Sequence, residues 1–118
     1  MYVYYVHYIL HCTCSMFNST GTVHVHVCEA PMGNMHEITT DDWSITGPPS
    51  GYDSIRARGI KEPSENVCVT LQFDGKNVQV PQAQAQPTGI SSNFQHNEYL
   101  VYREDQHRIR YVLEFEIQ

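Results

Sequence analysis

Alternation between apolar and polar side chains is the strongest structural signal in this sequence, and it is most regular between residues 67 and 80. The apolar positions fall at every second residue, at Val67, Val69, Leu71 and Phe73, and then at Val78 and Val80. Between the two runs stands Asp74-Gly75, a dipeptide that favours a tight turn because both residues tolerate a positive φ. The stretch therefore predicts two antiparallel strands joined in a hairpin.

The remainder of the chain after residue 28 also favours β-structure. Residues 33–38 predict a short strand, and the Pro- and Gly-rich residues 46–51 predict a loop. Residues 81–87, PQAQAQP, predict a further extended loop. Near the C-terminus Ile109, Tyr111, Leu113, Phe115 and Ile117 share one face, opposite Arg108, Arg110, Val112, Glu114 and Glu116. That pattern predicts an amphipathic strand with one solvent-facing side, and no helical period exceeds two turns, so the chain reads as mainly antiparallel β.

Charge and composition exclude several classes of function. The net charge is −6 with only seven Lys and Arg, which argues against a nucleic-acid surface, since phosphate binding needs clustered cations. The one basic cluster, Arg56, Arg58 and Lys61, is too sparse to predict a DNA site. No stretch approaches the ~20 apolar residues of a membrane helix. Without a recognisable secretory signal, the four cysteines are expected to be reduced thiols inside a cell.

The first 27 residues differ in composition from the rest and form the first of two predicted regions, 1–27 and 28–118. They contain no Lys, Arg, Asp or Glu, and Val, His, Tyr and Cys recur in near alternation. One interpretation is a pair of strands around residues 18–21. Another is translated simple-repeat DNA, because alternating purines and pyrimidines encode Val-His-Val-His-Val-Cys. The histidines and cysteines lack the spacing of zinc knuckles, so no metal site is predicted.

Residues 96–102, His-Asn-Glu-Tyr-Leu-Val-Tyr, predict an interior strand, because residues 99–102 look buried on both faces. Glu98 stands at its start, on the same side as Leu100 and Tyr102. Burying a carboxylate there would cost on the order of several kcal/mol unless a partner or ligand compensated. The pattern alone leaves two interpretations, a solvated glutamate at a strand start and a functional carboxylate.

Five short motifs follow one another in a recognisable order. They are CEAPMGNM at 28–35, PPSGYDSIRARG at 48–59, FDGKNVQVP at 73–81, TGISS at 88–92 and NEYLVY at 97–102. Their order resembles the C-terminal half of a poly(ADP-ribose) polymerase catalytic domain, most of all in the DNA-break-activated nuclear branch and its mono-ADP-ribosylating member. The resemblance covers about residues 28–117 and implies an α+β, mainly antiparallel β fold, present as a partial ADP-ribosyltransferase fold.

The resemblance implies a chemistry in which NAD, a co-substrate, is cleaved at the nicotinamide–ribose bond and ADP-ribose passes to an acceptor protein. It makes Glu98 the catalytic carboxylate, hydrogen-bonded to the ribose 2′-hydroxyl of an oxocarbenium-like transition state. The substrate-binding candidates are His96, Asn97, Tyr99, Tyr52 and Ser54, and an ungapped count places Tyr2 at a nicotinamide-stacking position. No metal is implied, the expected location is the nucleus, and DNA breaks would be sensed only by other domains.

The sequence departs from the family pattern in two respects. No His-Gly strand or Lys-Ser-x-x-Tyr motif precedes Gly33, so the chain is expected to be a fragment that lacks most of the NAD pocket and is inactive or nearly so alone. His96 occupies a position that is often Tyr in chain-forming members, which leaves mono- and poly-ADP-ribosylation as open alternatives. A different class of function, a non-catalytic interaction module, also remains open because exposed strand edges favour pairing with another chain.

Overall fold

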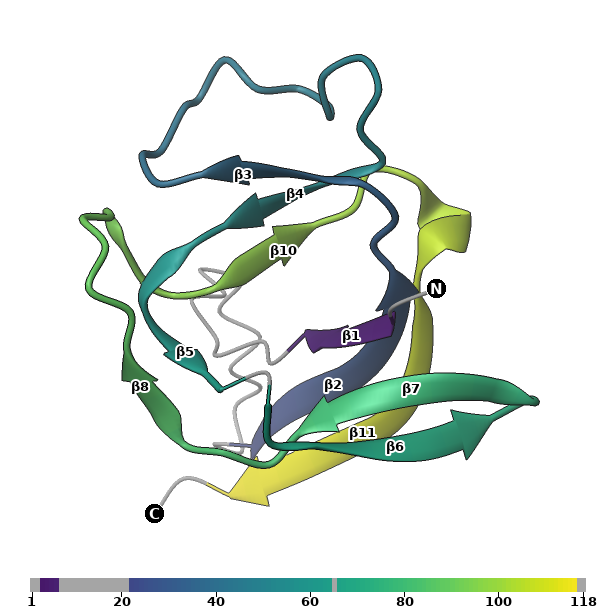
Figure 1. The fold of residues 1–118 in the computed structure, drawn as a ribbon. Coiled ribbons are helices and arrows are strands. Elements are labelled where there is room, and N and C mark those ends of the chain that lie inside the picture. The colour runs from purple at the N-terminus through teal and green to yellow at the C-terminus, as the bar shows by residue number, and fades with distance from the viewer. Residues whose placement is uncertain (1–2, 7–21, 65, 117–118) are drawn as a thin grey trace.

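The computed structural model describes residues 3–6, 22–64 and 66–116, which form eleven strands and one 3-10 turn (Figure 1). The elements in chain order are β1 (Val3–Val6), β2 (Thr22–Pro31), β3 (Met35–Ile38), β4 (Ser54–Ala57), β5 (Gly59–Pro63), β6 (Cys68–Phe73), β7 (Lys76–Pro81), β8 (Ala85–Pro87), β9 (Phe94–His96), β10 (Glu98–Leu100), η1 (Glu104–Gln106) and β11 (Arg108–Glu116). No helix in these residues is long and apolar enough to cross a membrane.

The strands form three sheets. The largest has the order β11-β2-β1-β7-β6, and the two smaller ones have the orders β10-β4-β3 and β8-β5-β9. Most neighbours are antiparallel, as predicted, but β3 with β4, β5 with β9 and β1 with β7 are parallel. The predicted α component is not found in the described residues, where η1 is the one helical element. The sequence had no long helical period, and α came only from the resemblance.

The predicted hairpin is confirmed in its register. Phe73 pairs with Lys76, so the connection is the dipeptide Asp74-Gly75, and both of these residues have positive φ, 51° and 73°. Such a turn matches the right-handed twist of the flanking strands. The strand predicted within residues 33–38 is confirmed as β3, and residues 46–51 lie in a loop between β3 and β4.

Two strand predictions need correction. The expected loop at 81–87 contains β8, whose Ala85–Pro87 backbone pairs with Lys61–Pro63 of β5. The strand tolerates its proline because β8 is at a sheet edge, where one side of the backbone needs no hydrogen bonds. The expected amphipathic strand is β11, but its apolar side chains on both faces are 43–55% exposed. Its pairing with β2 also shifts at Arg110, between Ile109 and Tyr111, which interrupts the alternation.

In the N-terminal region the structure describes two strands, as one of the two interpretations predicts, but not the loop expected between them. β1 pairs antiparallel with β2, with Val3 opposite Pro31. β2 continues across the predicted boundary at residues 27 and 28, and that boundary remains a prediction. The predicted loop at 18–21, Tyr2, His11, Cys12 and Cys14 lie outside the described residues.

The core of the described structure is small and centres on β4. All four residues of that strand are buried, and Ile55 and Ala57 are each 1% exposed. Met32 and Val78 are the other large side chains that are nearly inaccessible. β4 lies between β3 and β10, so the strand carrying Glu98 is supported directly by the most buried strand of the molecule.

Candidate active site

Glu98 begins β10, which among the described strands lies at the edge of its sheet and is not the interior strand that the sequence predicted. β10 pairs on one side with β4, and Glu98 lies opposite Ala57. Glu98 and Leu100 are exposed, whereas Tyr99 between them is half-buried. Tyr102 is exposed as well. Because successive side chains of a strand point to opposite faces, Glu98 projects to solvent while its neighbour turns toward the protein.

Asn97 fastens the strand at the residue before Glu98. Its Oδ1 accepts a hydrogen bond of 2.8 Å from the backbone N–H of Gly59. Its Nδ2 donates to Oε2 of Glu62 at 3.0 Å and lies 3.4 Å from the hydroxyl oxygen of Tyr99. The oxygen and the nitrogen of the Asn97 amide therefore both bond to β5, and these bonds fix the backbone just before β10.

Beneath Asn97 lies a cluster of two arginines and two glutamates, Arg56, Arg58, Glu37 and Glu62, here called the arginine–glutamate cluster. Arg56 Nη2 donates to Glu62 Oε2 at 2.7 Å, and Arg58 Nη2 donates to Glu62 Oε1 at 2.9 Å. Glu37 lies 3.4 Å from Arg56 and 3.9 Å from Arg58. The two arginines of the sparse basic cluster are thus neutralised by carboxylates within the protein.

Electrostatics in this cluster favour the charged forms. Burial alone would raise the pKa of Glu62, but hydrogen bonds from Asn97, Arg58 and Arg56 outweigh it, and the pKa is lowered. Burial likewise opposes the charge of Arg56, which is 8% exposed, yet Tyr99, Glu62 and Glu37 raise the pKa of its guanidinium. A paired and hydrogen-bonded arginine can remain charged in this position.

Tyr99 connects β10 to the same cluster. It lies directly opposite Arg56 in the antiparallel pair of β10 and β4, so the two side chains share a face. Asn97 and Tyr99, the two neighbours of Glu98, are therefore both tied to the arginine–glutamate cluster. The Glu98 carboxylate therefore faces solvent, while contacts of the two neighbouring residues fix the backbone that carries it.

His96 ends β9, where its backbone pairs with Lys61 and passes very close to Gly59. A Cβ placed on Gly59 would lie 2.4 Å from the carbonyl carbon of His96 and 2.5 Å from its Cα. Glycine is therefore required where β5 meets the His96–Asn97 backbone.

Tyr52 and Ser54 lie away from Glu98. Ser54 is at the start of β4, three residues before the partner of Glu98, a separation of roughly 10 Å along a strand. Its hydroxyl is buried and donates to the carbonyl of Met32 at 2.6 Å. The exposed Tyr52 packs edge-on to His36, with ring centroids 5.0 Å apart. The structure brings His96, Asn97, Glu98 and Tyr99 together, and the roles of all six residues remain predictions.

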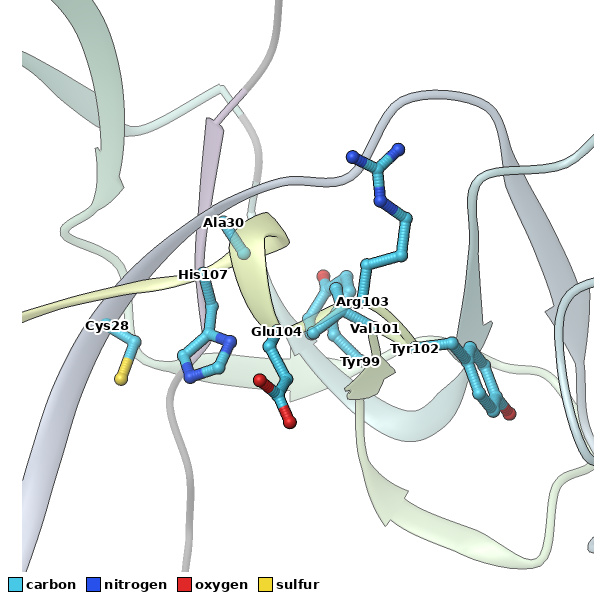
Figure 2. A pocket seen from close by; sticks show the side chains of 8 residues that line it. All are labelled: Cys28, Ala30, Tyr99, Val101, Tyr102, Arg103, Glu104 and His107. Carbon is cyan, nitrogen blue, oxygen red and sulfur yellow. The ribbon is translucent and has the colours of Figure 1, made fainter.

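A pocket of about 280 Å³ lies beside Tyr99 and does not include Glu98. Its lining consists of Cys28, Ala30, Tyr99, Val101, Tyr102, Arg103, Glu104 and His107, drawn in Figure 2. Burial raises the pKa of the Cys28 thiol, which disfavours the reactive thiolate. Within residues 3–6, 22–64 and 66–116 no three His, Cys, Asp or Glu side chains are grouped to hold a metal ion.

Sequence reasoning missed the part that the arginine–glutamate cluster plays at this site. The sequence alone marks Arg56 and Arg58 only as cations and gives no sign that Glu37 and Glu62 pair with them. The available signal was charge balance, because two arginines two residues apart in an acidic chain need acidic partners once they are buried. Which glutamates supply them depends on strand pairing, which the sequence does not show.

Comparison with known proteins shows which protein family the chain belongs to. Residues 10–117 match the model of the poly(ADP-ribose) polymerase catalytic domain. The chain belongs to this family. It is 45% identical over 91 residues to the protein mono-ADP-ribosyltransferase PARP3 of Mus musculus and 46% identical over 88 residues to that of Homo sapiens. It is 35% identical over 86 residues to poly [ADP-ribose] polymerase 1 of Xenopus laevis.

These matches cover much of this chain but little of each relative. The mouse and human matches include 75% and 73% of this chain and 17% and 16% of the relatives, and the Xenopus laevis match includes 72% and 8%. The chain therefore corresponds to about one sixth of the length of the two PARP3 relatives. Its membership of the polymerase catalytic family rests on the matched region alone.

Proposed function

We propose that this chain carries the catalytic carboxylate, Glu98, of an NAD-dependent protein ADP-ribosyltransferase. The observation that carries the proposal is the contrast at β10, where Glu98 is exposed while both of its neighbours are tied to the arginine–glutamate cluster. A preorganised carboxylate of this kind can act on a charge that develops only in the transition state.

The reaction would break the bond between nicotinamide and ribose, leaving an oxocarbenium-like ribose. The Glu98 carboxylate would accept a hydrogen bond from the ribose 2′-hydroxyl and stabilise that positive charge, while nicotinamide leaves with the bonding electron pair. The nucleophilic side chain of the acceptor protein would then form the new bond to ribose. The exposure of Glu98 fits this role, since substrate can reach the carboxylate without any movement of β10.

Several finer features belong to the same proposal. His96 would lie on the acceptor side and would influence whether one ADP-ribose or a chain is added. Asn97 and Tyr99 would position Glu98 more than they contact substrate, because their side chains turn to the cluster. Tyr2 would contact nicotinamide. Nuclear location and activation by DNA breaks would depend on the whole protein, to which other domains contribute.

The proposal can be tested in a chimera in which the matched part of this chain, 75% of its length, replaces the corresponding stretch of the Mus musculus PARP3 relative. With labelled NAD and an acceptor protein, the chimera should transfer ADP-ribose. Glu98→Gln should lower kcat on the order of 10²–10³-fold with a smaller change in KM, because the lost interaction forms in the transition state. The chain alone supplies the baseline, at which little or no transfer is expected.

Glu104→Gln is the matched control, since it makes the same chemical change on the exposed turn η1 and should leave kcat unchanged. Equal turnover of the Glu98→Gln chimera and the parent chimera would exclude a catalytic role for Glu98.

A second candidate function, an interaction module without catalysis, is favoured by the exposed apolar side chains of β11. ADP-ribose transfer that depends on Glu98 in the chimera separates the two, because an interaction module without catalysis would supply none.

A further inference from the structure

The side-chain amide of Asn97 satisfies its surroundings in only one orientation. On one side the backbone N–H of Gly59 needs an acceptor, and Asn97 Oδ1 accepts from it at 2.8 Å. On the other side the Glu62 carboxylate accepts but does not donate, and Asn97 Nδ2 donates to it at 3.0 Å. A rotated amide would set donor against donor and acceptor against acceptor. The two partners on β5 therefore fix the amide of the residue that precedes Glu98.

Glu62 is itself held in place by two arginines. Arg56 Nη2 donates to Glu62 Oε2 at 2.7 Å, and Arg58 Nη2 donates to Oε1 at 2.9 Å, so both carboxylate oxygens are bound. Hydrogen bonds between charged groups are stronger than those between neutral ones. Arg56 belongs to the buried strand β4, and its side chain is only 9% exposed. The core strand therefore sets the position of the Glu62 carboxylate, which in turn orients Asn97.

Glu37 belongs to the same arginine–glutamate cluster but fits this role less well. Its carboxylate lies 3.4 Å from Arg56 and 3.9 Å from Arg58, and its side chain is 47% exposed, against 22% for Glu62. Among the described residues it is Glu62, and not Glu37, that accepts the hydrogen bond from Asn97. Glu62 is thus the carboxylate that joins the two arginines to Asn97.

We propose that Glu62 is a positioning residue for ADP-ribosyl transfer, which acts by orienting the amide of Asn97 and thereby the backbone that carries Glu98. The proposal rests on the catalytic role proposed for Glu98. In this role Glu62 touches neither NAD nor the acceptor. Without Glu62 the Asn97 amide has no reason to keep one orientation, and the Glu98 carboxylate moves away from the place where it meets the ribose 2′-hydroxyl. Small displacements of a reacting group lower turnover steeply.

A double-mutant cycle in the chimera tests the positioning role. Glu62→Ala should lower kcat about tenfold and leave KM for NAD nearly unchanged, because transition-state geometry is lost and substrate binding is not. In the Glu98→Gln background the same change should lower kcat less than about twofold, because the carboxylate that Glu62 positions is already gone. An equal factor in both backgrounds would indicate a merely structural loss and would overturn the proposal, as would an unchanged kcat.

Asp105→Ala is the matched control for this cycle. Like Glu62→Ala it removes a carboxylate that accepts two hydrogen bonds from arginine, in this case both from Arg103, but it does so on the exposed turn η1. Asp105→Ala should leave kcat and KM unchanged. A fall in kcat as large as that of Glu62→Ala would show that loss of any arginine-paired carboxylate has this effect, and would overturn the specific role of Glu62.

Amide hydrogen exchange in the full chain, followed by nuclear magnetic resonance, tests the Glu62–Asn97 contact without catalysis. Glu62→Ala should speed exchange of the Gly59 N–H about tenfold, because a rotated Asn97 amide no longer accepts from it. The N–H of Thr88, which donates to a carbonyl of β5 at 2.9 Å, should keep its rate. Unchanged exchange at Gly59, or equal acceleration at Thr88, would overturn the positioning role and leave the catalytic role of Glu98 standing. Equal turnover of the parent and Glu98→Gln chimeras is the different result that overturns both.

Discussion

The side-chain amide of Asn97 donates a 3.0 Å hydrogen bond to Oε2 of Glu62, the same oxygen that accepts Arg56 Nη2 at 2.7 Å. This contact joins the residue before Glu98 to the most buried charge of the described structure. Buried contacts of Asn97 therefore help to fix the position of the exposed Glu98 carboxylate. Positioning of Glu98 and stability of the arginine–glutamate cluster should accordingly change together.

Asn97→Ala should lower the free energy of unfolding by about 1–3 kcal/mol, because the part-buried N–H of Gly59 loses its acceptor. Urea denaturation monitored by far-UV circular dichroism measures this change in the free energy of unfolding. Asn93→Ala is the control, since the Asn93 side chain bonds to Asp41 at the exposed surface and its loss should cost little. Equal destabilisation by the two substitutions would show that Asn97 is not a special anchor.

Acid should weaken the fold partly through Glu62, whose pKa is lowered in the folded state. A carboxylate with a lowered folded pKa contributes stability that is fully present above its unfolded pKa, about 4.3, and is lost as pH falls through the folded pKa. Glu62→Gln should therefore flatten the acid side of a plot of unfolding free energy against pH. Glu104→Gln should keep the wild-type slope, and an unchanged slope in Glu62→Gln would contradict the assignment.

The hairpin of β6 and β7 could be predicted from sequence because its information is local. Alternating side chains define the two strands, and Asp74-Gly75 supplies the backbone angles of the turn. The edge position of β10 could not be predicted in this way. Four apolar residues in a row are compatible with an interior strand, and their exposure depends on which distant strands pair with β4.

The candidate site shows the same division. The motif makes Glu98 a candidate catalytic residue, and its position at a strand start follows from the pattern of its neighbours. The cluster behind it joins β3, β4 and β5, so Glu37 and Glu62 become partners of Arg56 only after the chain has folded. Long-range strand pairing of this kind leaves no periodic trace in the sequence.

Gly59→Ala should destabilise the fold by about 1–3 kcal/mol, because the new methyl group would overlap the His96 backbone. The displacement would also move Asn97, which precedes Glu98. ADP-ribose transfer by the chimera should therefore fall together with its stability. Gly47→Ala is a matched control, since nothing lies within 4 Å of a Cβ at that position. A Gly59→Ala protein as stable as Gly47→Ala would mean that β5 and β9 are not as close as described.

Gly75→Ala should destabilise the β6–β7 hairpin by about 1–2 kcal/mol, because Gly75 has φ of 73° and an L-residue with a Cβ is strained there. Gly75→Asn tolerates the left-handed region better and should recover part of the loss.

The contribution of charge at the turn is separable, since Asp74→Asn keeps a residue suited to positive φ but removes the pairs with Arg108 and Arg110. The hydrogen bond and charge of Arg110, and then those of Arg108, lower the pKa of Asp74, so the effect of Asp74→Asn should diminish in high salt, whereas that of Gly75→Ala should not. Salt-dependent urea titrations of the three variants provide the measurement, and a salt-sensitive Gly75→Ala would contradict a purely conformational role for the glycine.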